Sequence, residues 1–430
     1  MSWRSTGALD RAIGLGGLGL GLAVAVGDAV LVVLAAPFLV LGALGLVHRP
    51  SSRPVLTARL DHYSVHEGQG TRSRLAISDL DGVEHVTRVA APTPYVAMHP
   101  AHGRLGQLVT DGTRPPEVEV SPRRWGRRTL GAEYVALTSR WGGYRWGPVT
   151  LEGNPMRVLP VRAPYDSRAE APQPLGLVGA HRSRRVGGGT EFSGIRPFQA
   201  GDRLRRINWR VSLRTQALHV VTARAEEDTG VLLVVDALAD HGRSGGVDGF
   251  ASSMDVAVRA AAAVAEHHAR QGDRVALRVV GLDRTAVGYG AGQRHLRMLL
   301  GQLAAIRVGQ PHGRAPHSLE FGVTGGTVVI VLSPMLSEVM GTATASMVKR
   351  GLPVLVIDTL PADVAPGVVE GTDPEIADLA WRMRRLERDS VLSRLAGLGC
   401  PVVAWRGPGT LDEVMHRLAR RAQLPQVRTR

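Results

Sequence analysis

The chain has 430 residues, enough for two or three domains, and its single cysteine, Cys400, excludes an internal disulfide. Aromatic residues make up only 4% of the sequence, so the cores must be built mainly from Ala, Val and Leu. The formal net charge of +14 suits nucleic acid or an anionic membrane surface, but no recognised nucleic-acid-binding motif accompanies it.

Residues 1–52 predict a transmembrane hairpin. Between Ala12 and Val47 the only charged residue is Asp28, which separates a glycine-rich half from the longer half at 29–47. The longer half can span a hydrocarbon core of ~30 Å, whereas the shorter half needs local thinning of the bilayer or help from its flanks. Arginines flank the pair on both sides and none lies between the halves, so the positive-inside rule places both ends in the cytoplasm. The alternative is a cleaved signal peptide, with the small residues 23–25 as the cleavage site.

Residues 53–162 change to short runs in which apolar and polar residues alternate, separated by Gly, Pro and Asp-Gly turns. This alternation is typical of antiparallel strands, so we expect a β-sandwich or a small barrel. The basic run 123–128 contains Trp125, but one aromatic residue is too few for a stacking platform, and a solvated loop or a loop facing lipid headgroups is the better interpretation. Residues 163–186 hold three prolines and little that could fill a core, which predicts an extended linker.

Residues 187–227 form the segment around which the chain is organised. They gather many charged residues around one tryptophan, and such residues are rarely fully buried unless they are paired. One interpretation is a salt-bridged strap between domains, in which Glu191 or Asp202 pairs with an arginine and Trp209 packs against the C-terminal domain. The other interpretation is a docking or ligand site. The candidate residues are Glu191, Arg196, Gly201, Asp202, Arg205, Asn208, Trp209 and Arg214.

These residues resemble the signature of the bacterial family known as domain of unknown function 58. That signature has Glu-Phe, Arg, an aromatic residue, Gly-Asp, Arg, Ile-Asp/Asn-Trp and a final Arg, and its counterparts here run from Glu191 to Arg214. The departures are Phe198, where the family usually has Tyr, and Leu213, where it has Ala. The resemblance covers nearly the whole chain and implies a membrane-anchored protein with a von Willebrand A-like C-terminal domain. It implies no known reaction, but it suggests a companion of MoxR-type AAA+ ATPases.

Residues 228–430 alternate apolar strands with helical patterns. The predicted strands are 231–236, 274–280, 285–290 at an edge, 327–332, 353–358 and 402–405, and the predicted helices are 252–270, 294–306, 338–349, 374–398 and 411–422. Strands that are apolar throughout and alternate with helices indicate a doubly wound parallel sheet. The expected architecture is therefore multidomain: a transmembrane hairpin, an antiparallel β-sandwich and a doubly wound α/β domain.

Ligands of such sheets bind beyond the carboxyl ends of the strands, which places Asp236, Ser333 and Asp358 at the rim. In the von Willebrand A pattern the first strand ends in Asp-x-Ser-x-Ser, and those oxygens help to hold a magnesium ion. Here residues 236–240 are Asp-Ala-Leu-Ala-Asp, without either serine, and Ser333 stands where a later acid is expected. Because Mg²⁺ demands near-octahedral oxygen ligation, we expect no metal and no other cofactor. Asp236 would be a degenerate remnant that caps a helix or pairs with an arginine.

No catalytic constellation can be argued from residue spacing, so the leading hypothesis is a non-enzymatic scaffold or adaptor. It would lie in the cell membrane as a multi-pass protein with cytoplasmic C-terminal domains. It would dock a protein partner, which the resemblance suggests is a MoxR-type AAA+ ATPase. Two alternatives stay open: a nucleic-acid-binding protein, which the charge favours, and a hydrolase in which Glu191 or Asp202 is the acid or base.

Overall fold

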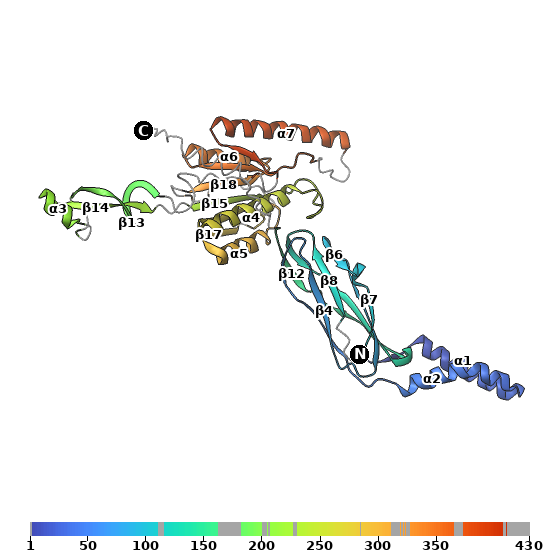
Figure 1. The fold of residues 1–430 in the computed structure, drawn as a ribbon. Helices are drawn as coiled ribbons and strands as arrows, with labels where there is room; N and C mark the ends of the chain where they lie inside the picture. Colours follow the sequence, from blue (N-terminus) through green and yellow to red (C-terminus); the bar gives the residue numbers. More distant parts are fainter. Residues whose placement is uncertain are drawn as a thin grey trace. The chain divides into compact units, whose positions relative to one another are not determined.

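The computed structural model describes residues 2–110, 116–161, 182–199, 204, 207–226, 230–283, 285–310, 319, 321, 323, 327–364, 373–406 and 410, with only the backbone described for 182–193 and 222–226. The chain divides into two compact units, Met1–Leu159 and Pro160–Arg430. Figure 1 shows both, with the chain coloured from blue at the N-terminus to red at the C-terminus.

The first two helices, α1 (Gly7–Val26) and α2 (Ala29–Val47), form the predicted apolar pair. Thr6 caps the start of α1 by accepting a hydrogen bond from an amide of the first turn, and Gly27 ends the helix in the left-handed conformation that favours glycine. The Asp28 side chain then caps α2. Most side chains of both helices are exposed, and each helix is long and apolar enough to cross a membrane.

Small residues let α1 and α2 approach closely. A Cβ placed on Gly19 would lie 2.7 Å from the Ala35 Cβ, and one placed on Gly16 would lie 2.9 Å from the Leu39 Cδ2. Glycine at these positions therefore permits contact between the helix backbones, which is how apolar helices associate where lipid offers no hydrophobic driving force.

The rest of the first unit contains three sheets, with strand orders β1-β11-β10-β5-β7, β2-β4-β8-β6 and β3-β12-β9. All neighbouring strands are antiparallel except the parallel pair β3–β12. The bounds are β1 Arg4–Ser5, β2 Val55–Leu60, β3 Ser64–His66, β4 Thr71–Ser78, β5 Val83–Ala90, β6 Val96–His99, β7 Leu105–Leu108, β8 Glu117–Pro122, β9 Gly126–Thr129, β10 Glu133–Ser139, β11 Tyr144–Leu151 and β12 Pro155–Leu159, with short 3-10 turns η1 Ala101–Gly103 and η2 Arg140–Gly142.

Two of these sheets face each other across one hydrophobic core. Leu56 and Leu75 of the β2–β4 pair pack with Val86, Val135 and Leu137 of the β5–β10 pair. The alternating pattern of the sequence produces this arrangement, because every second side chain of a strand points to the same face.

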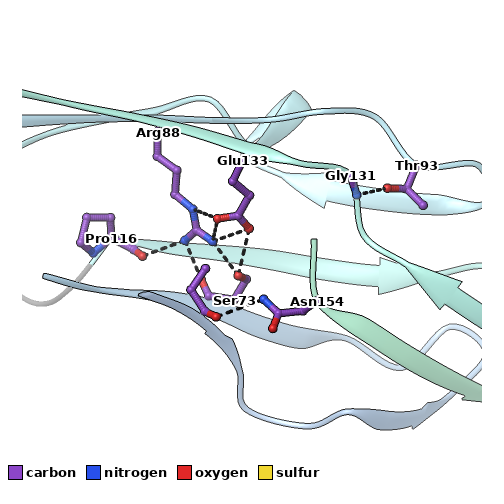
Figure 2. A network of polar contacts seen from close by, with 8 residues as sticks. Ser73, Arg88, Thr93, Pro116, Gly131, Glu133 and Asn154 are labelled. Atoms are coloured by element: carbon purple, nitrogen blue, oxygen red, sulfur yellow. Dashed lines mark hydrogen bonds and ion pairs between the residues drawn. The ribbon is translucent and has the colours of Figure 1, made fainter. Parts of the chain in front are cut away.

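An ion pair lies inside this core. The Arg88 guanidinium, which is fully buried, donates to both carboxylate oxygens of Glu133 at 2.7–3.0 Å. Its remaining N–H groups donate to the carbonyl oxygens of Ser73 and Pro116 and to the Ser73 hydroxyl (Figure 2). All five donors of the side chain are thereby satisfied, which is the condition under which a buried arginine is tolerated.

The signature segment forms a two-stranded antiparallel ribbon that carries a short helix. Strand β13 (Arg182–Pro197) pairs with β14 (His219–Glu226), and α3 (Trp209–Thr215) lies in the connection between them (Figure 1). Strand β13 begins inside the segment 163–186, which was predicted to be an extended linker, and Arg182 and Val186 pair with β14. Residues 162–181 of the predicted linker lie outside the described part of the chain.

The α/β prediction is confirmed. One six-stranded sheet has the order β17-β16-β15-β18-β19-β20, and all its strands are parallel except the antiparallel edge strand β17. Its elements in chain order are β15 Gly230–Ala237, α4 Ser253–Gln271, β16 Arg274–Gly281, β17 Thr285–Gly290, α5 Gly292–Leu303, β18 Val328–Ser333, α6 Glu338–Lys349, β19 Val354–Asp358, α7 Pro374–Gly397 and β20 Val402–Ala404. The predicted last helix at 411–422 lies outside the described residues.

Helices cover both faces of this sheet, with α4 and α5 on one side and α6 and α7 on the other (Figure 1). Strands β15 and β18 are buried along their whole length, as continuous apolar strands between two helical layers must be. Ser252 and Asp255 form a reciprocal capping box that starts α4, and Gly272 ends it in the left-handed conformation.

Candidate functional site

The tip of the ribbon is fixed by local hydrogen bonds that the sequence encodes. The Asn208 side-chain oxygen caps α3 by accepting from the Val211 amide at 3.2 Å, and the Asn208 backbone N–H donates to the His219 carbonyl at 2.8 Å. The buried Ser212 hydroxyl accepts from the His219 amide at 2.9 Å. Ile207 is buried and bridges to Val220 of β14. One side of α3 is therefore held against β14, and Asn208 has a structural role as the cap.

The outward side of α3 presents apolar and basic side chains to solvent. Trp209 is 62% exposed and Leu213, one turn later, is 78% exposed. Leu204, which precedes α3 in the sequence, and Leu218, which follows it, are also exposed. Arg210 and Arg214, again one turn apart, are exposed in the same way. We call Leu204, Trp209, Arg210, Leu213, Arg214 and Leu218 the signature tip. Trp and Arg are the residues most enriched at the energetic centres of protein interfaces.

The structure does not bring all the predicted signature residues together. Trp209 was expected to pack against the α/β domain if the segment is a strap, but its side chain is largely exposed. Arg196 lies on β13, where its guanidinium donates to the Pro197 carbonyl at 3.0 Å. Gly201, Asp202, Arg205 and the side chain of Glu191 lie outside the described residues, so the expected carboxylate–arginine pairs stay predictions.

Three carboxylates among the described residues lie at the rim of the sheet, Asp236, Asp240 and Asp358, and each accepts hydrogen bonds from other groups of the protein. Buried Asp236 accepts from the Ser333 hydroxyl at 2.6 Å and from the Leu238 amide at 3.1 Å. Burial raises the pKa of Asp236, although these two hydrogen bonds oppose the shift. The expectation that Asp236 caps a helix or pairs with an arginine is therefore wrong, because a serine on the neighbouring strand takes its second oxygen.

Asp240 and Asp358 take the two roles that were expected of Asp236. Asp240 accepts from the Met254 amide at 3.0 Å and from the hydroxyl groups of Ser252 and Ser253, so it caps the start of α4. Asp358 accepts from Arg388 of α7 and from the Leu360 amide. Leu238 and Asp240 stand where the von Willebrand A pattern has serines, so the residues do not supply its set of oxygens for Mg²⁺. Within the described residues no group of three His, Cys, Asp or Glu side chains is placed to hold a metal.

A second exposed apolar surface lies on α7. Ile376, Leu379, Met383 and Leu386 are all exposed, while Leu395 further along the helix is buried in the core. We call the four exposed residues the α7 stripe. Their spacing of three and four residues puts them on one face of the helix. The α7 stripe was not predicted from the sequence, although apolar residues at this spacing are present within 374–398.

A family model matches the part of the chain that holds these features. The model of the family described as "Protein of unknown function DUF58" matches residues 194–388, which run from β13 to α7 and include the signature tip, the rim and the α7 stripe. An uncharacterized protein of Mycobacterium bovis and two of Mycobacterium tuberculosis are each 28% identical over 264 residues. The alignments cover 54% of this chain and 78% of each relative. The family match supports the resemblance seen in the signature, and none of these descriptions states an activity.

Proposed function

We propose that this chain is a membrane-anchored, non-enzymatic scaffold that docks a protein partner through the signature tip. The observation that carries the proposal is the exposure of Trp209 and Leu213 on the outward side of α3. An indole that is mostly in solvent buries little of its area in the fold, but at an interface it supplies a large, rigid contact area. Arg210 and Arg214 beside it favour a partner surface that carries carboxylates.

The anchor is the α1–α2 hairpin, which we infer to cross the cell membrane twice. Arg4 precedes α1 and Arg11 lies near its start, and Arg49 and Arg53 follow α2. The turn between the helices, Gly27-Asp28, carries no positive charge. The positive-inside rule then places both ends, and with them the β-sandwich and the α/β domain, in the cytoplasm.

The α/β domain is inferred to be of the von Willebrand A type. Three features support this: the strand order with a single antiparallel edge strand, the acid Asp236 at the end of the central strand, and the resemblance stated above. The resemblance also suggests that the partner is a MoxR-type AAA+ ATPase. Docking would not depend on Mg²⁺, because the rim carboxylates are engaged by Ser333, by the start of α4 and by Arg388.

Two other functions predict different properties that can be measured. A nucleic-acid-binding protein would lose affinity steeply as salt rises and would occupy a defined site size. A hydrolase built on Glu191 or Asp202 would need a carboxylate of raised pKa in a cleft. No observation favours either function over docking.

The test is photo-cross-linking from the tip. A photoreactive amino acid replaces Leu213 in the full-length chain, and the same replacement at Leu379 in the α7 stripe is the matched exposed, apolar control. We expect one protein to cross-link from position 213 and not from 379, and we expect it to be a MoxR-type ATPase. Cross-linking only from 379, or from neither position in intact cells, would contradict docking through the tip.

A further inference from the structure

We propose that the end of the β-sandwich beside the hairpin is a binding site for the headgroups of anionic phospholipids. The site consists of Arg4, Arg49, Arg140, Trp141 and Arg145, which we call the collar. The proposal rests on the membrane anchoring proposed above and goes beyond it, because it assigns a lipid preference to residues of the sandwich.

The start of α1 is pinned to the turn that carries the collar. Strand β1 pairs with β11, so that Arg4 lies opposite Arg145. The Thr6 amide donates to the Gly143 carbonyl at 3.0 Å, and the Thr6 hydroxyl donates to the Gly142 carbonyl at 2.6 Å. The N-cap residue of α1 is therefore hydrogen-bonded to the last residue of the η2 turn and to the residue that follows it.

The end of α2 touches the same turn. A Cβ placed on Gly143 would lie 3.1 Å from the Gly45 Cα, so the two backbones are in contact. Gly45 lies two residues before the end of α2 at Val47, which is about 3 Å along a helix that rises 1.5 Å per residue. If α2 spans the bilayer, Gly143 and the residues beside it lie at the level where hydrocarbon gives way to headgroups.

The side chains at this level have the chemistry of a headgroup site. Trp141 is 55% exposed, and an indole with one apolar body and one N–H donor favours the membrane interface. Arg4, Arg49, Arg140 and Arg145 are all exposed. Guanidinium groups match the oxygens of a phosphodiester with paired hydrogen bonds. The Arg49 guanidinium also lies 5.6 Å from the centre of the Tyr144 ring, which helps to hold it at the base of the hairpin.

Two carboxylates of the sandwich accept hydrogen bonds from backbone amides at or beside the collar. Glu84 accepts from the Trp141 amide at 2.9 Å, and Trp141 has a φ of 59°, a left-handed conformation that is uncommon for a residue with a side chain. Asp79 accepts from the Arg53 amide at 2.7 Å. Glu84 thus stabilises the conformation that holds Trp141 in the turn. A constrained backbone at an exposed aromatic residue is the kind of outlier from which a function can be inferred.

The experiment measures how closely Trp141 approaches lipids of known charge. The full-length chain is reconstituted in vesicles in which either phosphatidylglycerol or phosphatidylcholine carries a fluorescence quencher near the headgroup. The part of the quenching that belongs to Trp141 is the difference between the wild type and Trp141→Phe. We expect phosphatidylglycerol to quench this emission more strongly than phosphatidylcholine. We also expect Arg140→Gln/Arg145→Gln to lower the preference by about fivefold per arginine at low ionic strength.

The matched control is Arg127→Gln/Arg157→Gln, which removes two exposed arginines from strands β9 and β12 of a different sheet. This variant should keep the wild-type lipid preference. Equal quenching by both lipids in the wild type, or an equal loss of preference in both double variants, would overturn the collar while leaving the anchor intact. Free inorganic phosphate should not abolish the preference; if it does, the site is one for soluble phosphate and the proposal is wrong. A chain that floats with neither kind of vesicle would overturn the anchor and the collar together.

Discussion

The hydroxyl group of Ser333 donates a 2.6 Å hydrogen bond to the carboxylate of Asp236 across the neighbouring parallel strands β18 and β15. Both side chains are buried at the carboxyl end of the sheet. Desolvation raises the pKa of Asp236 above its usual 3.8, and the hydrogen bonds from Ser333 and Leu238 only partly oppose that shift. One oxygen of the Asp236 carboxylate therefore has its hydrogen-bond donor on the neighbouring strand of the same sheet.

A raised pKa makes the stability of the α/β domain fall as pH rises. Between 3.8 and the folded-state pKa, native Asp236 holds a proton that the unfolded chain has released. Its stabilising contribution is complete below 3.8 and is lost as pH rises through the folded-state pKa. Asp236→Asn should therefore flatten this dependence and leave the domain at least as stable at pH 7. Urea unfolding monitored by pulse labelling of buried Cys400 reports on this domain, because the chain has no other cysteine.

Asp283→Asn is the matched control, because its pKa is shifted the other way. The exposed carboxylate of Asp283 is hydrogen-bonded by Arg307, which lowers its pKa. Its contribution is present above the unfolded value of 3.8 and is lost as pH falls. A steeper fall of stability toward pH 8 in Asp236→Asn than in the wild type would contradict the assignment of a buried, protonation-prone acid.

The buried pair Arg88–Glu133 predicts a large cost when only one partner is removed. Arg88→Met leaves the Glu133 carboxylate uncompensated in the sandwich core, which should lower the free energy of unfolding by about 3–5 kcal/mol. Removing both charges in Arg88→Met/Glu133→Leu should recover part of this loss, but not all of it, because the carbonyl groups of Ser73 and Pro116 still lose their donor.

The measurement is urea unfolding followed by the fluorescence of the buried Trp125 and Trp146, with Cys400 labelling to show that the α/β domain is unaffected. A single variant that costs less than about 1 kcal/mol, or a double variant that is less stable than the single one, would show that the pair is not coupled in this way.

The hairpin predicts that two neighbouring glycines respond differently to the same substitution. Gly19→Val puts a side chain where a Cβ already lies 2.7 Å from the Ala35 Cβ, whereas Gly17 has open space around it. Both changes add the same apolar group, so only helix packing distinguishes them. We expect Gly19→Val to separate α1 from α2 and Gly17→Val to be tolerated.

Disulfide formation between cysteines placed at Ile13 and Gly42, whose side chains would meet across the pair, measures this contact in a Cys400→Ser background. Gly19→Val should slow the cross-link several-fold relative to Gly17→Val. Equal rates would mean that the glycine contact does not hold the helices together.

Periodicity in the sequence was sufficient to predict the described helices and strands of the α/β domain. Strands such as 231–236 are apolar throughout and lie between helices, so their burial on two faces follows from composition alone. The partners of polar residues could not be derived in this way. Asp236 was expected to cap a helix, but that role belongs to Asp240, because hydrogen bonds depend on the register of neighbouring strands and not on residue type.

Arg88 was overlooked although the pattern contained a signal. It is in phase with Val86 and Ala90, so alternation alone points its side chain into the core. A buried arginine then demands a buried acid, and Glu133 is in phase with Val135 on the adjacent strand in the same way. Similarly, the charge-rich sequence around Trp209 suggested a strap, and only the fold of α3 against β14 shows which side chains point outward.

The arginines that flank the hairpin predict its topology. A reporter fused after Arg430 should be active in the cytoplasm, and alkaline carbonate should not release the chain from membranes. Replacing Arg49 and Arg53 with Glu should reduce the fraction of chains in this orientation, since the bias depends on positive residues near the ends of the spans. A reporter signal from the exported side, or extraction by carbonate, would contradict the anchor.

The central claim is that the signature tip docks a protein, and its most direct test is the affinity of the full-length chain, in lipid nanodiscs, for the partner that cross-links from position 213. Trp209→Ala should weaken this affinity by about 30-fold, the loss expected when a central interface tryptophan is removed. Leu379→Ala, which removes an exposed leucine from the α7 stripe, should change it by less than about twofold. An unchanged affinity in Trp209→Ala, or a comparable loss in Leu379→Ala, would show that the partner does not bind at the tip.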